Sequence, residues 1–239
     1  MTEIKVMVVD DSPFMRRVIS DIINGQADMK VVATARNGEE ALLAAKRFAP
    51  DVITMDVEMP VMDGLEALQR IMKDNPLPVV MLSSVTKQGA DATVKALHLG
   101  AVDFITKPSG TLSPDINEVA RDIVKKIRIA ALARDKLRLT QVRVDKRIKP
   151  PKVSPAGIDK APEKVILIGT STGGPKALHE VIPKLPGNIP AAVLVVQHMP
   201  PGFTRSLAER INGMSALNVK EAVDGEPVLS GNVYIAPGD

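Results

Sequence analysis

Apolar runs rich in β-branched residues alternate with segments of helical periodicity along the first half of the chain. The apolar runs are IKVMVVDD, KVVATA, DVITMD, PVVMLSS and AVDFITKP. The helical periodicity covers residues 13–24, 38–47 and 63–74, a segment that ends at Leu99 before Gly100, and residues 113–139. Because strands that are apolar along nearly their whole length are buried on both faces, we expect a parallel sheet with helices on each side.

A segment without apolar periodicity, TQVRVDKRIKPPKVSPAGIDKAPE, follows the fifth helix and is rich in proline and charge. That composition is typical of an interdomain linker. Beyond it, strands are predicted in KVILIGTS, AAVLVVQH, LNVKEA and VYIAP, with helices over residues 175–182 and 203–211. The second α/β domain is expected to be doubly wound and incomplete, because the chain ends in the turn-like sequence APGD directly after an apolar strand.

We therefore expect an α/β protein with a first domain at residues 1–122, a helix extension and linker at residues 123–162, and part of a second domain at residues 163–239. A length of 239 residues suits two domains of ordinary size.

The absence of cysteine excludes disulfides, thiolate metal sites and a cysteine nucleophile. No apolar run is long enough to cross a bilayer, and the N-terminus lacks the pattern of a signal peptide, so we expect a cytoplasmic protein without a membrane span.

The net charge of +3 reflects basic residues that gather between Arg121 and Lys152. Such a cluster is one signature of nucleic-acid binding. It lacks interleaved aromatic residues, however, and a solvated helix face that continues into a linker explains it more simply. We favour the simpler explanation and expect no nucleic-acid partner.

Polar residues gather at the predicted carboxyl ends of the strands in the first domain, which is where parallel α/β sheets bind ligands. Asp10 and Asp11 follow the first strand, Asp56 the third, Ser83 the fourth and Lys107 the fifth. Carboxylates brought together repel one another unless a cation joins them, and hard oxygen ligands suit Mg²⁺. With that ion and the lysine ammonium present, a carboxylate can attack a phosphoryl group. A helix cap or an ordinary loop position would explain any one of these residues, but not the occurrence of all five at the ends of four separate strands.

The motifs VVDDS, MDVEMPVMDG, MLSS and ITKP closely resemble the two-component receiver family over about residues 3–122. The resemblance implies a flavodoxin-like fold with strand order 2-1-3-4-5, and it makes Asp56 the phosphoryl acceptor. It also implies that Mg²⁺ is held by Asp10, Asp11, Asp56 and the backbone carbonyl of Glu58. The remaining roles that it implies are the switch hydroxyl for Ser83, the switch aromatic for Phe104 and the phosphate-contacting lysine for Lys107.

In the second domain, the strand KVILIG leads into a glycine-rich turn and then a helix. The sequence GTSTG, centred on Ser171, has the spacing of a nucleophile elbow, in which a crowded turn exposes a serine beside helix N-terminal amides. Amides of Thr172, Gly173 and Gly174 could then stabilise an oxyanion. An ordinary turn is the alternative for so short a match. A phosphate-binding loop is nearly matched as well, but Pro175 stands where its lysine belongs.

The next strand, AAVLVVQH, delivers His198 at its carboxyl end, where a neighbouring parallel strand would bring it close to Ser171. A general base is thereby available. The other histidines, His98 and His179, lie within predicted helices, and we interpret them as surface or structural residues.

The motifs GTSTGGP, VVQHMPPGFT and YIAPGD resemble the catalytic domain of the chemotaxis protein-glutamate methylesterase family over residues 163–239. The resemblance implies hydrolysis of glutamate γ-methyl esters, and in many members deamidation of glutamines, with Ser171 as nucleophile, His198 as general base and no cofactor for the hydrolysis. It implies a chemotaxis histidine kinase and methyl-accepting chemoreceptors as partners. The family aspartate that orients the histidine is expected beyond Asp239, so we expect this chain to lack it.

Two other interpretations stay open. A response regulator with a transcriptional output would have a helix-turn-helix after the linker, whereas this segment opens with a strand and a glycine turn. A receptor-binding response regulator without chemistry would keep the second domain but would show no reactive serine.

Overall fold

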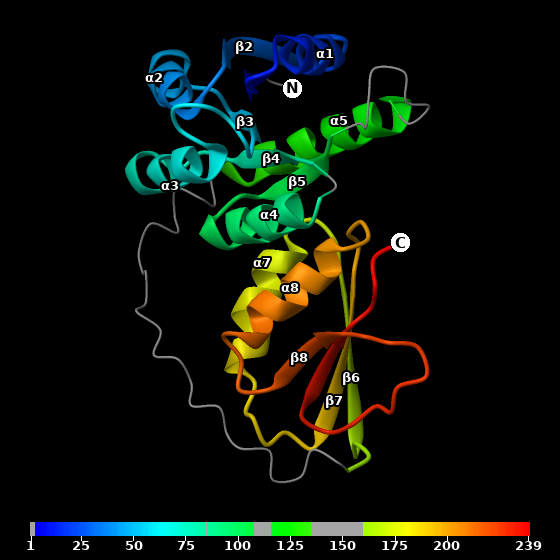
Figure 1. Cartoon of the computed structure of the whole chain (residues 1–239). Coiled ribbons are helices and arrows are strands. Elements are labelled where there is room, and N and C mark those ends of the chain that lie inside the picture. Colours follow the sequence, from blue (N-terminus) through cyan, green and yellow to red (C-terminus); the bar gives the residue numbers. More distant parts are fainter. Residues whose placement is uncertain (1–2, 85, 108–115, 135–159) are drawn as a thin grey trace. The chain divides into compact units, whose positions relative to one another are not determined.

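The computed structural model describes residues 3–84, 86–107, 116–134 and 160–239, and the chain divides into two compact units (Figure 1). One unit comprises Met1–Arg143 and the other Val144–Asp239. The predicted linker lies mostly outside the described residues, as do both ends of the predicted helix at 113–139 and much of the basic cluster. In the part of the chain that is described, no helix combines the length and the apolar character that crossing a bilayer requires.

The first unit is a five-stranded parallel sheet with helices on both faces (Figure 1). Its strands are β1 (Ile4–Val9), β2 (Met29–Ala35), β3 (Val52–Asp56), β4 (Val79–Ser83) and β5 (Asp103–Thr106). Its helices are α1 (Pro13–Asn24), α2 (Gly38–Phe48), α3 (Gly64–Asp74), α4 (Lys87–Leu99) and α5 (Ile116–Leu132). The spatial order β2-β1-β3-β4-β5 confirms the predicted flavodoxin-like order.

Local sequence explains where the helices of this unit begin. In α1 to α4, the residue before the helix has an extended backbone, and its side chain accepts a hydrogen bond from the backbone N–H three residues later. The capping residues are Ser12, Asn37, Asp63 and Thr86. Each bond satisfies an otherwise unpaired N-terminal donor and contributes about 1 kcal/mol. The helices therefore start close behind the strands, at the edge where the polar residues gather.

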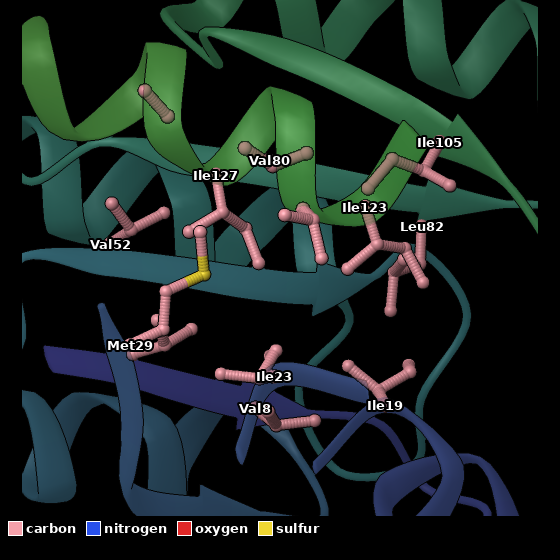
Figure 2. Close-up of a cluster of buried hydrophobic side chains, with 13 residues drawn as sticks. Val8, Ile19, Ile23, Met29, Val52, Val80, Leu82, Ile105, Ile123 and Ile127 are labelled. Carbon is pink, nitrogen blue, oxygen red and sulfur yellow. The ribbon is translucent and has the colours of Figure 1, made fainter. Parts of the chain in front are cut away.

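Figure 2 shows the buried cluster between the sheet and the helices α1 and α5. The labelled residues from the strands are Val8, Met29, Val52, Val80, Leu82 and Ile105, and those from the helices are Ile19, Ile23, Ile123 and Ile127. None of these side chains is more than 3% exposed. Burial of one such side chain contributes about 1.5–3 kcal/mol relative to exposure. This packing fixes the strands, and with them the residues at their carboxyl ends.

The second unit also contains an all-parallel sheet, as predicted. Its strands are β6 (Lys164–Thr170), β7 (Ala191–Gln197), β8 (Asn218–Glu221) and β9 (Asn232–Ile235). Its helices are α7 (Gly174–Val181), the short 3₁₀ helix η1 (Ile182–Lys184) and α8 (Phe203–Asn212). The spatial order is β6-β7-β9-β8, so β9 lies between β7 and β8.

Both α-helices of the second unit lie on the same face of its sheet (Figure 1). On the opposite face, Val165, Leu167 and Val196 are 51%, 75% and 63% exposed. Strands of a parallel sheet are usually covered on both faces. Within the residues that the structure describes, β6 and β7 are therefore packed by helices on one side and leave apolar side chains open on the other.

Candidate functional site

The structure brings the acidic residues of the first unit together at one edge of its sheet. Asp10 follows β1 directly, and Asp56 is the last residue of β3, the neighbouring strand. Carboxylate oxygens of Asp10, Asp11 and Asp56 all lie within 4.8 Å of one another. Asp10 and Asp56 are only 0% and 4% exposed, whereas Asp11 is exposed. The predicted cluster thus consists of two buried carboxylates and one that faces solvent.

A single ammonium group bridges the two buried carboxylates. Lys107 Nζ lies 2.7 Å from Asp56 Oδ2 and 2.9 Å from Asp10 Oδ2. The lysine follows β5 directly, and its backbone N–H donates to Ser83 O at 2.8 Å, which fixes its position beside the end of β4. One positive charge is therefore held against two negative charges at the strand ends.

Burial dominates the electrostatics of Asp56. Desolvation raises the pKa of its carboxyl group to about 6, and the charge of Asp10 adds to this rise, while the hydrogen bond and charge of Lys107 act against it. For Lys107, burial alone would lower the pKa, but hydrogen bonds and charges from Asp56 and Asp10 outweigh it and hold the pKa above its ordinary value. The charge of Lys107 therefore does not fully offset the burial of Asp56.

The acidic cluster of Asp10, Asp11 and Asp56 has the chemistry of a magnesium site. Hard cations take carboxylate oxygens together with water molecules, and Mg²⁺ usually binds through one or two carboxylates and keeps several waters. Asp10, Asp11 and Asp56 supply oxygens close enough to share one ion, and an added cation would offset the charge that burial makes unfavourable. Glu58 lies in the loop between β3 and α3, and the part of its backbone carbonyl in binding the ion stays a prediction.

The two predicted switch residues are both buried in this structure. Ser83 is 1% exposed, and its hydroxyl donates to the backbone carbonyl of Gly89, in the first turn of α4, at 3.0 Å. Phe104 is 3% exposed, and Lys126 of α5 places its ammonium 5.1 Å from the centre of the ring. Lys126 also donates to the Phe104 backbone carbonyl at 2.5 Å. Sequence reasoning did not single out Lys126, because it lies 22 residues further along the chain, in the basic cluster.

The raised pKa of Asp56 predicts a pH-dependent stability of the first unit without divalent cations. The folded unit favours the protonated carboxyl group of Asp56. The contribution of this group to the free energy of unfolding is therefore fully present below its pKa in the unfolded chain, and it is lost as the pH rises through about 6. We expect wild type to lose on the order of 2–3 kcal/mol more than Asp56→Asn between pH 4 and pH 7.5.

Urea titrations in EDTA, followed through amide signals of β3, measure this difference at each pH. Adding Mg²⁺ at pH 7.5 should restore stability to the wild type and not to Asp56→Asn. Parallel pH profiles of the two proteins in EDTA would contradict the predicted effect.

The serine turn of the second unit has the predicted sequence of strand, tight turn and helix. β6 ends at Thr170, Ser171 follows in an exposed position, and α7 begins at Gly174. Gly173 has a φ of 76°, a left-handed backbone conformation that residues with a side chain rarely adopt. Gly174 is packed so closely that a Cβ atom would lie 2.1 Å from Gln197 Oε1. Two glycines thus permit the turn that exposes the serine.

Hydrogen bonds inside the turn limit which amides can meet an oxyanion. The N–H of Gly174 donates to Ser171 O at 2.7 Å, so this amide closes the turn. The amides of Thr172 and Gly173 come before it, between the serine and the helix. Gly174 therefore shapes the turn through its amide, and the oxyanion role of Thr172, Gly173 and Gly174 stays a prediction.

Ser171 and His198 emerge from adjacent strands at the same edge of the second sheet. β6 and β7 pair in parallel, and their last register pair is Thr170 with Gln197. The next residues are Ser171 and His198, and the His198 N–H continues the pairing by donating to Thr170 O at 3.1 Å. Both residues are exposed. The structure therefore brings the two predicted catalytic residues to neighbouring positions on the backbone.

The other histidines have the positions that sequence analysis predicted. His98 is exposed on α4, and His179 is 4% exposed on α7, where its Nδ1 lies 2.7 Å from Pro175 O.

Two of the motifs in the second unit, VVQHMPPGFT and YIAPGD, are in contact, because the Gly238 N–H donates to Thr204 Oγ1 at 3.0 Å. The segment after His198 is therefore held against the last residues of the described chain.

Comparison with known proteins agrees with this arrangement. Residues 6–113 match the family model of the response regulator receiver domain, and residues 166–239 match that of the CheB methylesterase. The crystal structure of the response regulator domain of Thermotoga maritima CheB superposes on this chain with a TM-score of 0.50 and 54% sequence identity. The match covers 54% of this chain and 97% of that domain. These matches define a response regulator in which a receiver domain precedes a methylesterase segment.

Full-length relatives identify the family. The chain is 53% identical to protein-glutamate methylesterase/protein-glutamine glutaminase 1 of Syntrophomonas wolfei, over 98% of this chain and 66% of the relative. It is 52% identical to the protein-glutamate methylesterase/protein-glutamine glutaminase of Halalkalibacterium halodurans, over 99% and 67%. The chain thus spans about two thirds of the length of these curated relatives. It belongs to the protein-glutamate methylesterase/protein-glutamine glutaminase family.

Proposed function

We propose that this protein hydrolyses glutamate γ-methyl esters, and by the same chemistry glutamine side-chain amides, on chemoreceptors, and that phosphorylation of Asp56 regulates this activity. One observation carries the hydrolase part, namely that Ser171 and His198 directly follow the last register pair of β6 and β7. The names of the relatives, protein-glutamate methylesterase/protein-glutamine glutaminase, supply the ester and amide substrates.

In the proposed reaction, Ser171 attacks the carbonyl carbon of the ester while His198 accepts the proton of its hydroxyl group. The amides of Thr172 and Gly173 stabilise the negative charge that develops on the carbonyl oxygen. The protonated histidine then gives its proton to the methoxy leaving group, which departs as methanol. Water, deprotonated by His198, attacks the acyl-enzyme and releases the glutamate side chain and the free serine. No cofactor takes part in this hydrolysis.

In the receiver, the proposed phosphoryl acceptor is the carboxylate of Asp56. Mg²⁺ held by Asp10, Asp11 and Asp56 would neutralise charge on the incoming phosphoryl group. Lys107, at 2.7 Å from Asp56, would contact the bound phosphoryl oxygens. Ser83 and Phe104 are the proposed switch residues, which would have to leave the contacts they make here. A chemotaxis histidine kinase is the proposed phosphoryl donor, and the methyl-accepting chemoreceptors are the proposed substrates.

A serine-directed fluorophosphonate probe tests the hydrolase proposal. We expect one covalent adduct, at Ser171, which peptide mapping by mass spectrometry locates. Ser171→Ala should lack the adduct, and Ser230→Ala, which removes a hydroxyl from another part of the same unit, should keep it. If a folded chain carries no adduct at Ser171, the hydrolase proposal fails and a receptor-binding response regulator without chemistry becomes the better interpretation.

A further inference from the structure

Gln197 is a buried polar residue between the segments that carry Ser171 and His198. It is the last residue of β7 and the register partner of Thr170, and only 5% of it is exposed. A polar side chain that is buried in this way must find hydrogen-bond partners to offset the loss of its contacts with water. Its partners therefore show what its side chain holds in place.

The amide of Gln197 contacts both candidate catalytic segments. Its Nε2 donates to the backbone carbonyl of Ser171 at 3.1 Å and to that of His198 at 3.2 Å. Its Oε1 accepts from the Thr170 hydroxyl at 2.7 Å. Backbone carbonyls can only accept, so the NH₂ end must face Ser171 and His198 and the oxygen must face Thr170. The chemistry of the neighbours thus fixes the orientation of the side chain.

The amide of Gln197 is packed closely against Gly174 of the turn. A Cβ atom on Gly174 would lie 2.1 Å from Gln197 Oε1 and 2.6 Å from the Thr170 side chain. The Gly174 N–H in turn donates to Ser171 O, the carbonyl that Gln197 also contacts. The Ser171 carbonyl therefore accepts from both sides, once from the helix that follows and once from the neighbouring strand.

We propose that Gln197 is a positioning residue that fixes the backbone of Ser171 relative to that of His198, so that the serine hydroxyl lies within hydrogen-bond reach of the imidazole. This inference rests on the proposed hydrolase function. Proton transfer needs heavy-atom distances of roughly 2.6–3.2 Å, and a displacement of about 1 Å can lower a rate about 10²-fold. A side chain bonded to both segments at once restrains that distance.

The first test is the rate at which the fluorophosphonate probe modifies Ser171. Gln197→Met keeps much of the side-chain volume and removes every hydrogen bond, and we expect the rate to fall about 10²-fold. Gln197→Glu should fall at least as far, because its second carboxylate oxygen would face two carbonyl oxygens. Gln69→Met makes the same exchange at an exposed position of α3 and serves as the matched control, with a rate within about threefold of wild type.

A double-mutant cycle separates positioning from a general loss of structure. If Gln197 acts by aligning Ser171 with His198, then His198→Ala should cost much less in the Gln197→Met background than in wild type, because residues that act as a unit are not additive. Additive losses would overturn the inference. A rate of Gln197→Met within threefold of wild type would overturn it as well.

A second measurement does not depend on reactivity. Hydrogen exchange of the His198 and Gly174 amides should become at least tenfold faster in Gln197→Met, relative to the Ala236 amide, which donates to Val195 O on β7 at 2.8 Å. An unchanged ratio would overturn the positioning role, even in a chain whose serine reacts normally. If Ser171 does not react in the parent chain, the hydrolase proposal fails, and exchange still decides whether Gln197 holds the two segments.

Discussion

Asp56→Asn should abolish the transfer of a phosphoryl group from a small phosphodonor to this protein in the presence of Mg²⁺. Asp56 is the buried carboxylate at the end of β3 that lies beside Asp10 and Asp11 and 2.7 Å from the Lys107 ammonium. Its oxygen can attack phosphorus while positive charge on both sides screens the repulsion. An asparagine amide keeps the shape of the side chain but lacks the nucleophilic oxygen. Mass spectrometry of the intact protein should therefore show one added phosphoryl group in wild type and none in the variant.

The control for this prediction is Asp74→Asn, which removes an exposed carboxylate at the end of α3, outside the acidic cluster. This variant should be phosphorylated to the same extent as wild type. Asp11→Asn should lower the apparent affinity for Mg²⁺ without removing the acceptor, so phosphorylation should recover as the concentration of Mg²⁺ rises. The assignment of Asp56 is wrong if Asp56→Asn still gains the same base-labile mass increment.

His198→Gln should lower the rate of fluorophosphonate modification of Ser171 by about 10²–10⁴-fold, the usual contribution of a general base. The glutamine side chain can hydrogen-bond to the serine but cannot take its proton at neutral pH.

Another histidine of the chain provides the matched control. His98 lies exposed on α4 of the receiver, so His98→Gln changes the same kind of side chain far from the serine turn in sequence. Its rate of modification should equal that of wild type. A loss below tenfold in His198→Gln would mean that a different group, or water, accepts the serine proton.

Most of the fold could be predicted from the alternation of apolar strands and helical segments. The caps at Ser12, Asn37, Asp63 and Thr86 come directly from residue types that favour helix starts. The candidate site followed from the same reasoning, because strand ends in a parallel sheet collect at one edge. The structure places Asp56 beside Asp10 and Asp11, and Ser171 and His198 at the ends of adjacent strands, as expected. The roles assigned to these residues remain predictions.

Sequence reasoning missed what depends on packing between distant residues. Gln197 stands beside His198 in the motif VVQHMPPGFT, yet its importance arises from contacts with Thr170 and Ser171, 27 and 26 positions earlier in the chain. The contact of Lys126 with Phe104 depends in the same way on how α5 lies against the sheet. No periodicity or spacing predicts which rotamer such a side chain adopts, because the rotamer is set by its neighbours in the folded state.

The place of β9 in the second sheet has a consequence for the order in which a nascent chain can fold. β8 lies at the edge of that sheet, and its neighbour is β9, which is synthesised later. While residues 222–231 are still emerging from the ribosome, β6, α7 and β7 can already pair and pack, but β8 has no strand to join. Only when Asn232–Ile235 has emerged and inserted beside β7 can β8 dock. Among the strands described, β9 therefore enters the sheet after its neighbour β7 and brings β8 into place.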